Sequence, residues 1–118
     1  MPKRNPADSV NDILQSIEHV RDYSSKLSIE EFSSEPMRVE ACLYNVRIIA
    51  KAVSKLPEDV KAANPGIPWT LLKETKNKIV HDHIDTDMQL LWNFIKFELP
   101  SLVKKLKKLE TLLISRDV

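Results

Sequence analysis

The chain has 118 residues, and its 18 Lys and Arg against 17 Asp and Glu give a formal net charge of +1. This balance provides no overall field that would favour nucleic acid or a membrane surface as a partner. One glycine, Gly66, excludes a glycine-rich phosphate loop, and one cysteine, Cys42, excludes an internal disulfide. We expect one cytoplasmic domain over residues 1–118, because no signal-peptide core or apolar membrane span is evident.

The first elements are predicted to be helices with clear start signals. Asn5 is a candidate cap for a helix that runs to about Lys26, with apolar residues recurring every three or four positions. Ser28 and Glu31 have the spacing of a capping box and predict a short helix after it.

A second long helix is predicted over residues 36–56, starting at Pro36. Cys42 lies on its apolar core stripe, which predicts a buried and inert thiol. A second stripe on this helix is partly apolar and partly basic, which suits a dimer seam, a binding wall, or basic side chains lying over their own helix. Its members are Tyr44, Arg47, Ile48, Lys51 and Lys55.

The second half of the chain begins with one or two helical turns after Pro57 and a loop over residues 64–68. Pro68 then opens a helix that runs to about Val80. Thr86 is predicted to open a capping box for the next helix.

The last helix is predicted to run to about Leu113, and Pro100 inside it should produce a kink by removing one backbone hydrogen bond. No segment alternates with a period of two residues over a useful length. The sequence therefore predicts an all-α fold, an antiparallel four- to five-helix bundle with a kinked last helix. Its lysines predict a solvated face, with a binding patch or a membrane-surface helix as the alternatives; these are Lys104, Lys105, Lys107 and Lys108.

Titratable groups gather most densely in residues 76–85, where one helical pattern stops and another begins. Lys76 and His81 would point about 140° apart on a continuous helix. For the two to meet one ligand, the helix must end near His81 or a second subunit must supply the other half. The start signal at Thr86 favours a break between the two helices.

The chemistry of this stretch leaves several readings open. A histidine beside a cation suits metal-independent RNA cleavage, in which a 2′-hydroxyl attacks its own phosphate, and it also suits simple phosphate binding. Metal ligation by His81, His83 and either Asp82 or Asp85 would make a poor tetrahedral cage. A structural histidine pair is the remaining alternative.

The order of the motifs resembles the HepT-like family of the HEPN superfamily. The elements that carry the resemblance are Ile67-Pro68-Trp69, then residues 76–83, then Asp87 and Trp92, and the likeness extends from residue 12 to residue 100. The resemblance implies an all-helical homodimer that acts as a ribonuclease toxin. It also implies a minimal nucleotidyltransferase antitoxin as partner, which adds AMP to a tyrosine two residues after the catalytic histidine.

The resemblance implies His81 as the catalytic histidine, in a cleft at the dimer interface, and no cofactor. Lys76 stands where the family has an arginine, and it lacks the planar fork that grips a phosphate at two points. His83 stands where the family has the modified tyrosine. Arg47 and Lys51 occupy positions where relatives tend to carry glutamates.

Two hypotheses follow from these departures. In the first, His81 and His83 act as an acid–base pair and cationic groups hold the RNA phosphate, with Asn77 beside them; the cations are Lys76, Arg47 and Lys51. In the second, the site is inactive and the homodimer persists as a binding module for a nucleotidyltransferase partner or for RNA.

Overall fold

The computed structural model describes residues 5–80 and 86–116. The helices of its first half are α1 (Pro6–Ser24), α2 (Ile29–Ser33), α3 (Pro36–Lys55), α4 (Glu58–Ala62) and α5 (Trp69–Ile79). After residues 81–85 come α6 (Met88–Asn93), a π-helical turn η1 (Phe94–Glu98) and α7 (Leu99–Arg116). The predicted all-α bundle is therefore confirmed.

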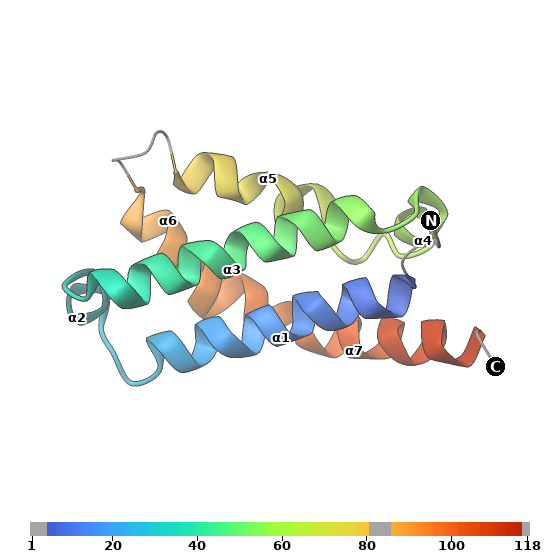
Figure 1. Cartoon of the computed structure of the whole chain (residues 1–118), viewed down its shortest axis with the longest axis horizontal. Helices are drawn as coiled ribbons and strands as arrows, with labels where there is room; N and C mark the ends of the chain where they lie inside the picture. Colours follow the sequence, from blue (N-terminus) through green and yellow to red (C-terminus); the bar gives the residue numbers. More distant parts are fainter. Residues whose placement is uncertain (1–4, 81–85, 117–118) are drawn as a thin grey trace.

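The four long helices lie side by side along the molecule (Figure 1). α1 packs against α3 in an antiparallel pair, α7 packs against α1, and α5 packs against α3. As a result, α5 and α7 occupy opposite edges of the bundle. α6 contacts α2 and α5, and η1 contacts α1.

The core is formed by the apolar stripes that the sequence predicts. Cys42 is fully buried among them, as expected. The buried side chains of the central helix pair include Val10, Ile13, Ile17 and Val20 in α1, and Val39, Val46, Ile49 and Val53 in α3. None of the helices in the described ranges is both long and apolar enough to cross a membrane.

Local start signals operate as predicted at the first two helices. The Asn5 side chain accepts a hydrogen bond from the backbone N–H of Ala7 at 2.9 Å. At α2, the Glu31 N–H donates to Ser28 Oγ at 3.1 Å, and the Ser28 N–H donates to Glu31 Oε1 at 2.9 Å. These bonds lower the pKa of Glu31, because they favour its charged form.

The predicted cap at Thr86 is wrong by one residue. Asp87 is the cap of α6, and its side chain accepts from the Leu90 N–H at 3.0 Å. Thr86 instead forms an isolated antiparallel bridge with Val80. Because this bridge holds Thr86 in an extended pairing, the helix begins after the following residue, whose carboxylate is itself a preferred cap.

The irregularity expected at Pro100 takes the form of a π-helical turn just before it. The Leu99 N–H donates to the Phe94 carbonyl, five residues back. Wider turns of this kind interrupt the regular hydrogen-bond ladder and redirect a helix. α6 accordingly runs at a steep angle to α7 (Figure 1).

Candidate functional site

The start of α5 is fixed by the Pro-Trp element. Trp69 Nε1 donates to the carbonyls of Lys61 and Asn64, each at 3.1 Å, and so ties the helix to the preceding loop. Leu72, Thr75 and Ile79 are then buried along one face of α5. This orientation leaves Lys76 and Asn77 exposed on the last turns of the helix.

The segments before and after residues 81–85 hydrogen-bond to each other where α5 ends. The Val80 N–H donates to the Lys76 carbonyl at 3.1 Å, and Val80 pairs with Thr86. The Asp87 N–H donates to the Ile79 carbonyl at 2.7 Å. The residues on either side of 81–85 therefore meet beside the last turn of α5. This helix ends at Ile79, which agrees with the predicted break.

The two candidate catalytic histidines fall within that anchored segment. His81 directly follows Val80, and both His81 and His83 lie outside the described residues. Their contacts with Lys76 therefore stay a prediction. What the structure does place is the attachment point of His81, next to the helix turn that carries Lys76 and Asn77.

The second stripe of α3 faces solvent. Tyr44 is 62% exposed. Arg47 and Lys51 are also exposed, and Ile48 is half-buried. A partly apolar, partly basic face without a covering element is thus present in the described part of the chain.

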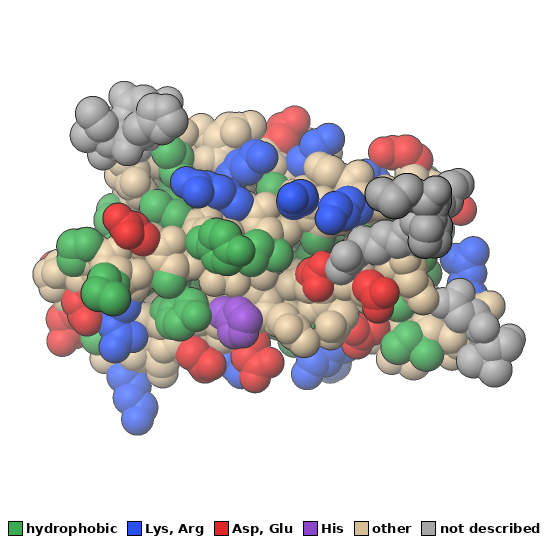
Figure 2. All heavy atoms as spheres, viewed as in Figure 1, with side chains coloured by type: hydrophobic (Ala, Val, Ile, Leu, Met, Phe, Trp, Pro, Cys, Tyr) green, Lys and Arg blue, Asp and Glu red, His purple; other side chains and the backbone are tan. Residues whose placement is uncertain are grey.

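Basic side chains collect where α3 and α5 run together. Figure 2 shows Lys and Arg gathered along one side of the molecule, over α5 and the adjoining part of α3. Arg47, Lys51, Lys76 and Asn77 form no side-chain hydrogen bond or ion pair with another described residue. Their polar groups are available to a ligand.

Lys73 adds a cation that the sequence reasoning did not single out. It is exposed and lies one turn before Lys76, so both project from the same side of α5. The spacing of three residues was the available signal.

A cysteine nucleophile and a metal site find little support in the described residues. Burial raises the pKa of the Cys42 thiol to about 12, so the thiol is protonated at neutral pH and does not serve as a nucleophile. No group of three or more potential metal-ligating residues occurs within residues 5–80 and 86–116. Ligation by His81, Asp82, His83 or Asp85, which the sequence argues against, involves residues outside these ranges.

The fold and the site define a helical-bundle protein with a row of exposed cations along one edge, and these cations have no partner within residues 5–80 and 86–116. Comparison with known families identifies it further. The model described as "Ribonuclease HepT-like" matches residues 13–109, and the chain belongs to this family.

Several curated relatives match nearly the whole chain. A protein named "Probable ribonuclease HepT" from Thermococcus cleftensis is 30% identical over 91% of this chain and 97% of its own length. A putative RNase from Methanocaldococcus jannaschii is 28% identical over 92% of this chain and 90% of its own length. Another putative RNase, from Caldanaerobacter subterraneus, is 26% identical over 90% of this chain and 95% of its own length. No solved structure matches the chain significantly.

Proposed function

We propose that this protein is a metal-independent RNA endonuclease and the toxin component of a toxin–antitoxin pair. The observation that carries the proposal is that Val80 and Thr86, which flank residues 81–85, pair with each other close to the exposed Lys76. His81 follows the end of α5 by two residues, and the last turn of that helix carries Lys76, whose ammonium has no partner among the described residues. Family membership supports RNA as the substrate.

The proposed reaction is an internal transesterification. His81 accepts the proton of an RNA 2′-hydroxyl, and the resulting oxygen nucleophile attacks the adjacent phosphorus. The bond from phosphorus to the 5′-oxygen breaks, and His83 donates a proton to that leaving oxygen. The products are a 2′,3′-cyclic phosphate and a free 5′-hydroxyl. Lys76, Arg47 and Lys51 stabilise the extra negative charge that builds up on the phosphate oxygens.

The active unit is proposed to be a homodimer with the cleft at its interface. The outer face of α3 presents Tyr44 and Ile48 beside Arg47 and Lys51. Burying the apolar members of this stripe against a second copy removes them from water. The basic members would then line the cleft between the two copies, next to the end of α5.

The decisive experiment is RNA cleavage by the purified protein in EDTA. We expect wild-type protein to produce 2′,3′-cyclic phosphate ends and His81→Ala to lose cleavage by at least about 100-fold. His19→Ala is the matched control, because His19 is an exposed histidine on α1. Equal cleavage by wild type and His81→Ala would refute the assignment of His81.

A catalytically silent binding module is the second candidate. The observation that favours it is chemical: Lys76 and His83 stand where the family motif has arginine and tyrosine. Without a phenol at position 83, AMP addition by a nucleotidyltransferase cannot occur there in the usual way. A dimer that binds RNA or an adjacently encoded nucleotidyltransferase, but leaves RNA intact, would establish this function instead.

A further inference from the structure

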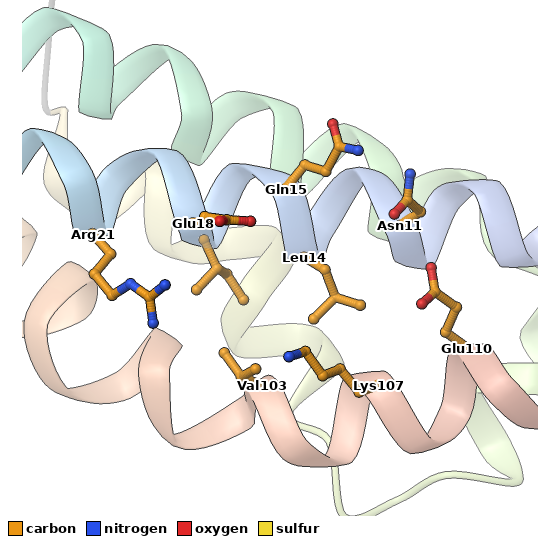
Figure 3. A pocket seen from close by; sticks show the side chains of 9 residues that line it. Asn11, Leu14, Gln15, Glu18, Arg21, Val103, Lys107 and Glu110 are labelled. Carbon is orange, nitrogen blue, oxygen red and sulfur yellow. The ribbon is translucent and has the colours of Figure 1, made fainter.

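A groove runs between α1 and α7 (Figure 3). It lies along the edge of the bundle opposite α5 (Figure 1). Its floor is apolar: Ile17 is buried, while Leu14 and Val103 are half-buried. The floor is continuous with the core but lacks a covering element among the described residues. The side chains along its rim therefore decide what it can bind.

Basic side chains predominate at one end of the groove. A hollow of about 380 Å³ is lined there by Ile17, Val103 and Pro100, with Arg21, Lys104 and Lys107 as its polar members. Glu18, which adjoins Arg21 on α1, lines the neighbouring part of the groove together with Arg21 and Lys107. Figure 3 shows Arg21 and Lys107 extending from their two helices into the space between them.

These three cations are unengaged. Arg21, Lys104 and Lys107 make no side-chain hydrogen bond or ion pair with another residue that the structure describes. Mutual repulsion makes such a grouping unfavourable in the absence of a counter-charge. An anion at this end would relieve the repulsion.

The lysines of α7 do not form one uniform solvated face. Lys104 and Lys107 line the groove, whereas Lys105 Nζ donates to the Gly66 carbonyl at 3.1 Å. Lys108 is exposed and does not line the groove. The structure therefore separates two lysines that join Arg21 from two that do not.

We propose that the basic end of this groove binds the phosphodiester backbone of single-stranded RNA. Arg21, Lys104 and Lys107 contact phosphate oxygens, and the apolar floor at Ile17 and Val103 accommodates a sugar or base. This inference rests on the proposed function, because it takes RNA as the ligand. It adds a binding surface on the edge of the protomer away from α5.

The far end of the groove limits the extent of this surface. Glu110 lines that end, where its carboxylate repels a phosphate chain, whereas Glu18 lies beside Arg21 on α1 (Figure 3). The bound strand should therefore leave the groove near Lys107 rather than follow its whole length. Neutralising both carboxylates should tighten RNA binding.

The test uses binding rather than cleavage. A fluorescent single-stranded RNA is titrated with His81→Ala protein, so that the RNA stays intact, and its affinity is measured over a range of salt concentrations. Combining Arg21→Gln and Lys107→Gln should weaken binding at low salt by about fivefold or more. The slope of log affinity against log salt should fall by about 1.4, since each neutralised phosphate contributes about 0.7 on a single strand.

The matched control combines Lys105→Gln and Lys108→Gln. It removes the same charge from exposed positions of α7 outside the groove. Glutamine is a good helix former, so both double variants should fold, which circular dichroism checks. If the control weakens binding as much as the groove variant does, the effect is one of net charge and the proposal is overturned.

The outcomes separate this inference from the proposed function. If wild-type protein fails to cleave RNA but the groove variant binds RNA more weakly than its control, the endonuclease fails and the groove surface stands. If wild-type protein cleaves RNA and the groove variant binds as tightly as its control, only the groove surface is overturned. In that case a helix of a protein partner becomes the better occupant of the groove.

Discussion

The ammonium of Lys96 lies 5.1 Å from the ring centroid of Trp92, and the same group donates to the Ser24 carbonyl at 3.2 Å. Lys96 thereby connects η1 to the C-terminal end of α1, where a cation is favoured by the helix dipole. Trp92 also contacts Phe32, with ring centroids 5.2 Å apart. These contacts fasten the irregular part of the last helix to the rest of the bundle.

Replacing Lys96 by methionine should show how much its contacts contribute to the stability of the bundle. Lys96→Met keeps the apolar stem but removes the charge and the donor, so we expect a loss of about 1–2 kcal/mol in the free energy of unfolding. Urea denaturation measures it. Lys108→Met, at an exposed position on α7, should stay within about 0.5 kcal/mol of wild type. Equal stability of the two variants would contradict the linking role.

Asp87 should matter for stability because it caps α6. Asp87→Ala removes the acceptor for the Leu90 N–H and should cost about 1 kcal/mol. Thermal unfolding measures the decrease in Tm, which is compared with that of Gln89→Ala, a change at an exposed position within the same helix. If Thr86→Ala proves more damaging than Asp87→Ala, the cap has been assigned to the wrong residue.

Cys42 should make stability depend on pH under alkaline conditions. Its pKa is about 12 in the folded protein, against 9.0 for an ordinary thiol. Above about pH 9 the unfolded chain therefore releases a proton that the folded chain retains, so this contribution to stability is lost as pH rises toward 12. Below pH 9 the contribution is fully present.

The measurement is urea unfolding of wild type and Cys42→Ala from pH 8 to pH 11. The two proteins share every other titratable group, so the difference between them isolates the thiol. We expect the stability of wild type to decline more steeply than that of Cys42→Ala. Parallel pH profiles would show that the thiol ionises in the folded protein as easily as in the unfolded chain.

Lys76 should contribute to catalysis through its charge. Lys76→Ala should lower the RNA cleavage rate by about 100-fold, because a cation next to the scissile phosphate is lost. Lys76→Arg should raise the rate, because a guanidinium can hold two phosphate oxygens at once. Lys73→Ala, one turn earlier on α5, should have a much smaller effect. An unchanged rate in Lys76→Ala would remove this lysine from the proposed site.

Tyr44 should be essential to the proposed dimer. Tyr44→Asp places a charge in the apolar part of the α3 stripe and should convert a homodimer into monomers while abolishing cleavage. Phe97→Asp is the control, because Phe97 is 66% exposed and lies on η1 instead. Light scattering measures the molecular mass. A dimeric Tyr44→Asp protein would move the interface away from α3.

Much of the fold could be predicted because the signals are local. Asn5 caps α1, and Ser28 and Glu31 bond within a single turn, so a short window of sequence contains both partners. The prediction failed at Thr86 because the residue that holds it, Val80, lies across the intervening segment. Likewise, the proline in the last helix predicted an irregularity, but its form as a π-turn depends on packing against the rest of the bundle.

The candidate site was likewise predictable only in part. Residue types and spacing were enough to mark residues 76–85 and the α3 stripe as candidates, because helical periodicity places residues on a face. The catalytic role expected of His81 came from the family resemblance. The sequence by itself thus determined the helices, their exposed faces and the family resemblance. Only the tertiary structure decided that Arg21 joins Lys107 across the α1–α7 groove while Lys105 bonds to Gly66. The physical reason is that such groupings depend on how separate helices pack, and no repeat within one helix encodes which neighbour it will meet.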